Sequence, residues 1–222
     1  DDERANMQIS YLPATGFDVA IESIDSPVVL NNGWNKVKAT FRNMAVDTIY
    51  WLDMGYKFGN NAQVLVNNYS GFPGGKLSAG EGFSYSFTDS FQVTQNGTYT
   101  LKVWVSNAND SIPDNTVAND TMSITLCTAL SGTYTIGSSG DYTTFNDAVN
   151  AMLSCGISGP VTFNVSAGTF NERVVLPEII GASSTNTITF KGQDAATTKL
   201  SYSGTNSSNR ATVVFDGGDY YR

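Results

Sequence analysis

Short apolar segments recur at intervals of about 26 residues in the second half of the chain, a period in the range of stacked repeats. This period constrains the fold more than any other feature. The segments span residues 161–165, 187–191 and 212–216, with a second series at 174–176 and 200–202. The central rings of the first series, Phe163, Phe190 and Phe215, follow one another at nearly equal intervals. Two interleaved series predict stacked coils that contribute strands to parallel sheets, as in a parallel β-helix. About three coils are too few for a complete β-helix, so we expect only part of one.

Upstream of Cys127 the pattern changes to short strands separated by turn residues. The predicted strands span residues 18–24, 36–43, 49–58, 63–66, 83–92, 98–106 and 120–126. So many short strands within about 110 residues favour an immunoglobulin-like β-sandwich. We therefore predict an all-β chain in three parts: a lead-in segment (1–16), an immunoglobulin-like sandwich (17–127) and the N-terminal part of a parallel β-helix (128–222).

One predicted strand, at 98–106, shows the alternation of a half-buried strand. Its residues Tyr99, Leu101, Val103 and Val105 form one apolar face, and Trp104 interrupts the polar face opposite. Together with Trp34 and Trp51, this tryptophan could form an exposed platform for stacking sugars. The alternative is that all three belong to the sandwich core or its edge.

A single helix is predicted at 145–153, with Phe145, Ala148, Val149 and Met152 on its apolar face. Thr143 or Thr144 can cap its N-terminus, and Gly156 ends it. A helix placed before the first coil is expected to cover the open apolar end of the stack.

Composition narrows the environment and the partners. The net charge of −8 without any histidine argues against nucleic acid or an anionic membrane as a partner. No apolar run approaches the roughly 20 residues of a membrane span, so we expect no membrane insertion. Low charge with abundant Thr, Ser and Asn is typical of extracellular proteins. The chain opens at Asp1 without a signal peptide, as expected of a mature or excised piece.

The two cysteines, Cys127 and Cys155, form no CxxC pair, and without histidine they cannot complete a zinc site. Both would lie near the start of the stack, which favours a disulfide between them. Two buried free thiols are the alternative.

Four short motifs mark the first part: Asp-Val-Ala-Ile at 18–21, Leu-Ser-Ala-Gly-Glu at 77–81, Gly-Thr-Tyr-Thr-Leu-Lys-Val-Trp at 97–104 and Ala-Asn-Asp-Thr at 118–121. Together they resemble the CARDB type of adhesion-related bacterial sandwich modules, over about residues 17–127. The last motif is typical of surface proteins of Bacteroidetes. The resemblance implies a spacer or recognition module and not a catalyst.

The second part carries Gly-Asp-Tyr-Thr-Thr-Phe-Asn-Asp-Ala-Val at 140–149 and Gly-Thr-Phe-Asn-Glu-Arg-Val at 168–174. These motifs resemble the opening of pectin-methylesterase and pectate-lyase-like right-handed β-helices. The segments 158–165 and 181–190 are similar to large secreted surface proteins of Bacteroidetes. The resemblance covers about residues 130–222.

The resemblance does not supply an active site, because the catalytic residues of the pectin-active families lie on middle coils. Asp141, Glu172 and Arg173 belong to the opening segment, where we expect them to close a turn, cap the helix and pair charge. The rest of the chain shows no paired carboxylates at a defined spacing and no phosphate-binding loop. We therefore predict no catalytic residue.

Two kinds of candidate site remain. Asp110, Asp114 and Asp120 lie in an Asn-rich segment whose oxygen atoms suit calcium, although the spacing matches no EF-hand and a solvated turn is the alternative. No other cofactor is predicted. Thr48, Ser111 and Thr121 each follow Asp and precede an apolar residue, which fits a glycosylation acceptor of secreted Bacteroidetes proteins.

These observations predict a non-catalytic part of a secreted or cell-surface modular protein, with a role in structural display, adhesion or glycan contact. Its expected partners are extracellular polysaccharide or another surface protein. The alternative is the N-terminal part of a polysaccharide-processing lyase, esterase or hydrolase whose active site lies beyond Arg222.

Overall fold

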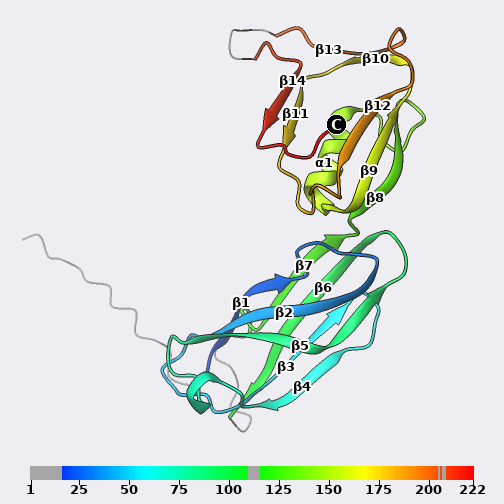
Figure 1. Ribbon diagram of the computed structural model, residues 1–222. Helices are drawn as coiled ribbons and strands as arrows, with labels where there is room; N and C mark the ends of the chain where they lie inside the picture. Colours follow the sequence, from blue (N-terminus) through cyan, green and yellow to red (C-terminus); the bar gives the residue numbers. More distant parts are fainter. Residues whose placement is uncertain (1–16, 110–115, 205, 207–208) are drawn as a thin grey trace, which may run out of the picture. The chain divides into compact units, whose positions relative to one another are not determined.

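The computed structural model describes residues 17–109, 116–204, 206 and 209–222 (Figure 1). Strands dominate the described residues, among which there is one α-helix, in agreement with the predicted all-β class. The contacts divide the chain into two compact units. The first takes in the described residues up to Pro27, then Lys36–Phe91 and Thr100–Ile124. The second takes in Val28–Asn35, Gln92–Tyr99 and Thr125–Arg222.

The strands that lie wholly or mostly in the first unit form two antiparallel sheets. They are β1 (Val19–Ser26), β2 (Gly33–Asn43), β3 (Leu52–Phe58), β4 (Val64–Tyr69), β5 (Gly82–Val93), β6 (Thr98–Ala108) and β7 (Thr121–Cys127), with a 3-10 turn, η1 (Pro73–Gly75). One sheet has the order β1-β2-β5 and the other β4-β3-β6-β7. Each predicted strand is present, with its ends shifted by about three residues or fewer.

The core of the first unit follows from the alternation of its strands. Leu101, Val103 and Val105 of β6 are buried, as the pattern at 98–106 predicts. Tyr56 of β3 is 1% exposed; its ring packs edge-on against Phe87 at 5.0 Å, and its hydroxyl donates to the Asp89 carbonyl at 2.9 Å. The hydroxyl thus keeps a hydrogen bond inside an apolar core, which avoids the cost of an unpaired buried donor.

The helix of the second unit, α1 (Phe145–Cys155), is two residues longer than predicted. Its buried residues are the four of the predicted apolar face. Thr144 and Asp147 form a capping box, in which each side chain accepts from the other's backbone N–H. Gly156 follows with φ of 68°, a conformation that favours glycine, and its N–H donates to the Met152 carbonyl. The helix packs against β8 and β11, the first strands of their sheets.

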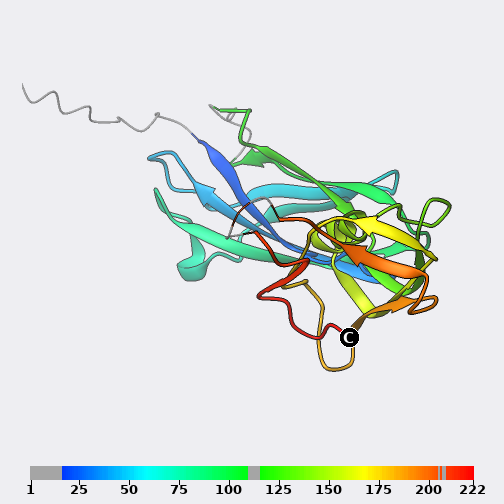
Figure 2. The ribbon, with the colours of Figure 1, turned by 90° about the horizontal axis from the view of Figure 1, so that it is seen from above.

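The remaining strands of the second unit pair in parallel. They are β8 (Leu130–Ile136), β9 (Ile157–Val165), β10 (Gly168–Asn171), β11 (Val174–Pro177), β12 (Ile188–Gly192), β13 (Thr198–Ser201) and β14 (Val213–Asp216). Phe163 pairs with Phe190, as their spacing in the sequence predicts, and Tyr134 pairs with Phe163. Figure 1 shows β9 and β12 running side by side, and Figure 2 gives the same ribbon seen from above. The rings of Phe163 and Phe190 stack at 5.0 Å.

The pairing corrects the sequence interpretation. The predicted series of 174–176 and 200–202 is wrong, because β11 pairs with β14 whereas β13 pairs with β10. There are three sets of parallel strands instead of two: β8-β9-β12, β10-β13 and β11-β14. The sequence period assigns the segment 212–216 to the series of Phe163, but Phe215 pairs with Leu176 of β11. The continuation of the β8-β9-β12 series is instead Tyr221, which bridges Ile188 in parallel. The Phe190 amide donates to the Arg222 carbonyl at 3.1 Å, and the Arg222 amide to the Ile188 carbonyl at 2.7 Å.

The core of the second unit is densest around α1 and β9 and thins toward β14. Val161 and Phe163 of β9 are fully buried. In β14, Val213 is 41% and Phe215 65% exposed. Strand β9 has a partner on each side, whereas β14 pairs only with β11. An edge strand with exposed apolar side chains has less to hold it in place.

We therefore expect the amides of residues 213–216 to exchange hydrogen fastest among the strands of the second unit, and those of 161–165 slowest. Hydrogen exchange followed by mass spectrometry, in dilute solution of the 222-residue chain, measures both segments in one experiment. Equal protection of the two segments would contradict the expectation.

Candidate functional site

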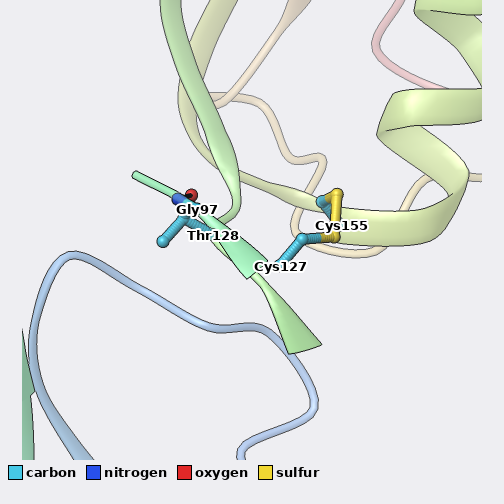
Figure 3. Close-up of a disulfide and its surroundings, with 4 residues drawn as sticks. All are labelled: Gly97, Cys127, Thr128 and Cys155. Carbon is cyan, nitrogen blue, oxygen red and sulfur yellow. Dashed lines mark hydrogen bonds between the residues drawn. A yellow bond between two sulfur atoms is a disulfide. The ribbon is translucent and has the colours of Figure 1, made fainter. Parts of the chain in front are cut away.

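The start of the second unit is fastened by a disulfide. Cys127, the last residue of β7, is joined to Cys155, the last residue of α1, with their Cα atoms 5.2 Å apart (Figure 3). Because α1 is amphipathic and capped at Thr144, its last turn reaches the chain where β7 ends. The bond closes a loop across 28 residues and no free cysteine remains.

Thr128, next to the disulfide, forms hydrogen bonds with the loop that contains Gly97 (Figure 3). The Thr128 amide donates to the Gly97 carbonyl at 3.0 Å, and its hydroxyl accepts from the Gly97 amide at 3.1 Å. The sequence analysis did not identify this residue. A threonine directly after a cysteine carries no signal by itself, since its partner lies 31 residues away.

Asp141 closes the turn that follows β8, as expected. One of its carboxylate oxygens accepts from both the amide and the hydroxyl of Thr135, each at 2.8 Å. The Thr135 hydroxyl in turn accepts from the Asp141 amide at 2.9 Å. Hydrogen bonds from the Thr135 side chain and backbone hold the pKa of Asp141 below its ordinary value.

Glu172 lies at the N-terminus of α1, although it is 27 residues from Phe145 in sequence. Its two carboxylate oxygens accept from the amides of Phe145 and Asn146, at 2.9 and 3.0 Å. The Asn146 side chain donates to the same carboxylate at 2.7 Å. A carboxylate here satisfies helix N–H groups that have no partner within the helix and complements the helix dipole.

Arg173 departs from the expectation of charge pairing. Within the described part of the chain it forms no ion pair, and its Nε is buried without a hydrogen-bond partner. Its carbonyl accepts from the Asn146 side chain at 3.2 Å. The resemblance placed an acid beside a base at 172 and 173, but Glu172 faces the helix instead.

Asp147 links the cap of α1 to the pH dependence of stability. Hydrogen bonds from the side chains of Thr143 and Thr144 keep the pKa of Asp147 below its ordinary value of 3.8. A lowered pKa in the folded state means that Asp147 contributes stability above pH 3.8, and that this contribution is lost as the pH falls through the folded-state pKa.

We therefore expect Asp147→Asn to lose less of its stability than the wild type between about pH 5 and pH 3. Thermal unfolding at a series of pH values measures the difference. Asp219→Asn is the matched control, because Asp219 is exposed and makes no described hydrogen bond. Parallel pH profiles for the wild type and Asp147→Asn would refute the assignment.

A polar hollow of about 580 Å³ opens beside the cap of α1. The hydroxyl groups of Ser138, Ser139, Thr143 and Thr169 line it, together with the ring of Phe170. The carboxylate of Glu172 also borders it, but its oxygens are already engaged by α1. Such a lining can exchange hydrogen bonds with water or with sugar hydroxyls.

A second, apolar hollow of about 220 Å³ lies among the last strands of the second unit. Leu176, Phe190, Leu200, Phe215 and Tyr221 line it. Burial raises the pKa of Tyr221 to about 12, and its hydroxyl donates to the Pro177 carbonyl at 3.0 Å. The lining of this apolar hollow is continuous with the core of the second unit.

The other candidate residues are only partly described. Asp110, Asp114 and Ser111 lie outside the described residues. Among the residues that are described, no group of three or more acidic or cysteine side chains is placed to hold a metal ion. The carbonyl of Asp120 accepts from the Val105 amide at 2.9 Å. Thr121 is exposed at the start of β7, and Thr48 is half-buried before β3.

The three tryptophans are separated. Trp34 is 70% exposed and belongs to the second unit, whereas Trp51 and Trp104 are half-buried in the first. Neither alternative of the sequence analysis therefore describes all three.

Comparison with known proteins gave fold neighbours for part of the chain. No protein-family model matches it, and no curated protein matches it. The solution structure of the CARDB domain of a Pyrococcus furiosus protein aligns with 53% of this chain and all of the domain, at 15% identity and a TM-score of 0.41. The crystal structure of that domain with di-metal ions aligns with 55% of this chain and 99% of the domain, at 14% identity and a TM-score of 0.38. Among the described residues no helix has the length and apolar character needed to cross a membrane.

Proposed function

We propose that the chain is a non-catalytic part of a secreted or cell-surface modular protein, in which an immunoglobulin-like module precedes the first coils of a right-handed parallel β-helix. Its role is structural display, adhesion or contact with extracellular polysaccharide. The observation that carries this proposal is the use of the acidic side chains at the opening of the second unit.

Those side chains accept hydrogen bonds from backbone amides. Asp141 binds the Thr135 amide and hydroxyl, and Glu172 binds two amides of α1. A general acid or base must be free to exchange a proton with a substrate held within hydrogen-bond reach. Carboxylates that already satisfy backbone donors are better suited to holding the fold.

The architecture supports the two modules. The sheet orders β1-β2-β5 and β4-β3-β6-β7 are compatible with the proposed sandwich, in which they would be strands A-B-E and C′-C-F-G. In the described part of the second unit there are three sets of parallel strands. In each set a strand pairs with one that comes later in the sequence. Each coil then contacts mainly its neighbours, as in a β-helix.

The disulfide supports an extracellular location. Disulfides persist in oxidising compartments and are rare in the reducing cytosol. The three glycosylation candidates and the calcium candidate in the Asn-rich segment fit the same setting and remain part of the proposal.

Catalysis and binding are separated by one experiment. The purified chain is incubated with pectin, polygalacturonate and neutral glycans, and the release of reducing ends, unsaturated uronates and methanol is followed. We expect no turnover, with retention of at least one glycan on the immobilised protein. Turnover that disappears in Glu172→Gln or Asp141→Asn, while the variant remains folded, would replace the proposal by a polysaccharide-processing enzyme.

Location is tested separately. In cells that produce the protein, an antibody against the chain should label intact cells or the culture medium. Labelling only after lysis would contradict a secreted or surface role.

A further inference from the structure

The outer face of the sheet β4-β3-β6-β7 carries one row of residues that the fold does not explain. Met54 and Tyr56 of β3 point into the core, so Gly55 between them faces outward. Its cross-strand partners are Leu65 on β4 and Trp104 on β6. Leu65 is 56% exposed, so an apolar row crosses the sheet at this level.

The six-membered ring of the Trp104 indole lies against Gly55. A Cβ atom at position 55 would come within 2.7 Å of Trp104 Cζ2 and 2.9 Å of Cε2. Glycine therefore lets the six-membered ring contact the backbone of β3. Trp104 is half-buried, and none of the aromatic ring pairs of the described residues includes it. The register thus places a half-buried aromatic ring on the outer face of the sheet.

Two lysines flank this ring. Lys57 on β3 and Lys102 on β6 are direct cross-strand partners, on the next outward level about 7 Å along the strands. Like charges directly opposite each other destabilise a sheet. Neither lysine forms an ion pair within the described part of the chain. On the opposite side of the row along β3, Asp53 accepts hydrogen bonds from the Asn68 amide and the Asn107 side chain, at 2.7 and 2.8 Å.

We propose that Trp104, Lys57 and Lys102 form a binding strip for an acidic polysaccharide. One sugar ring packs its C–H face on the indole, whose π face carries negative charge density. The carboxylate of a uronic acid unit, on the same or the adjoining sugar, lies between the two lysines and makes charge-assisted hydrogen bonds. The inference deepens the proposed glycan contact and rests on it.

Charge selects among acidic ligands. The net charge of −8 repels any polyanion at long range, but at physiological salt this repulsion is screened beyond about 8 Å. Two lysines suit a chain with one carboxylate per sugar better than a densely sulfated or phosphorylated polymer. An acidic peptide offers carboxylates too, but it lacks the rigid C–H face that a flat indole accommodates.

Titration calorimetry of the full chain with oligogalacturonate tests the strip. We expect measurable binding that weakens as salt is raised. Lys57→Gln with Lys102→Gln should weaken it by roughly two- to thirtyfold, the value of two ion pairs at the protein surface. Trp104→Leu should weaken it by at least about tenfold. Lys76→Gln and Trp34→Leu, which change an exposed lysine and an exposed tryptophan elsewhere, should leave it unchanged.

Circular dichroism and thermal unfolding establish that each variant is folded. Equal binding of carboxyl-reduced oligosaccharide would overturn the role of the lysines, and equal binding of poly-glutamate would show that an acidic peptide is the ligand. Absence of binding, or unchanged binding in the folded variants, would also overturn the strip. None of these results touches the proposed surface role, since intact-cell labelling and the turnover assay test that independently. The oligosaccharide should be recovered uncleaved.

Discussion

Removing the Cys127–Cys155 disulfide is expected to lower the free energy of unfolding by roughly 3 to 4 kcal/mol. The bond closes a loop across 28 residues, and chain entropy in the unfolded state grows when such a loop opens. The loop contains β8 and α1, so the first coil of the second unit should be destabilised most.

Denaturant unfolding with and without reductant measures this difference, and the double variant Cys127→Ser with Cys155→Ser should match the reduced protein. Reductant should leave the double variant unchanged. Thiol titration of the unreduced, denatured protein should find no free thiol. Two free thiols, or equal stability with and without reductant, would exclude the bond as a stabilising feature.

The second large effect is expected at Gly181, where two segments cross closely. The Ile157 amide donates to the Ile180 carbonyl at 2.9 Å, and a Cβ atom on Gly181 would lie 1.9 Å from the Ile157 carbonyl oxygen. Gly181 also has φ of 92°, which L-residues rarely adopt. Gly181→Ala must therefore move the backbone, and we expect a loss of about 3 kcal/mol or more.

Gly33→Ala is the matched control for this substitution. Gly33 belongs to the same unit and has φ of 99°, yet an added Cβ atom meets nothing within 4 Å. It should cost only the backbone strain, about 1 to 2 kcal/mol. Denaturant unfolding of both variants separates strain from the clash. If the two variants lose equal stability, the clash with the Ile157 carbonyl oxygen does not add to the loss at Gly181.

The sequence period predicted the pairing of Phe163 with Phe190 because β9 and β12 are separated by one coil of regular length. It failed for Phe215 because coil length is not constant. Ile188 pairs with Val161 across one such regular coil, whereas Tyr221 follows Ile188 only after a longer one. The apolar segment 212–216, which lies at the expected distance, therefore belongs to a different sheet. Apolar character alone does not tell which sheet a strand joins.

Local features of the candidate sites were predictable, and long-range ones were not. The cap at Thr144 and the end of α1 at Gly156 depend on neighbouring residues, and both were among the predicted signals. The contact of Glu172 with the helix N-terminus depends on how two distant segments pack. The same holds for Trp104, whose position depends on a glycine on another strand.

The disulfide also determines how the chain would bear a pulling force. Tension applied to the two ends passes directly from Cys127 to Cys155 through the sulfur atoms, so the residues between them stay slack even when the rest is stretched. Fully extended, a segment of that length would add about 90 Å to the chain. Under load, the residues of β8 and α1 would therefore add nothing to the extension of the chain for as long as the disulfide stays intact.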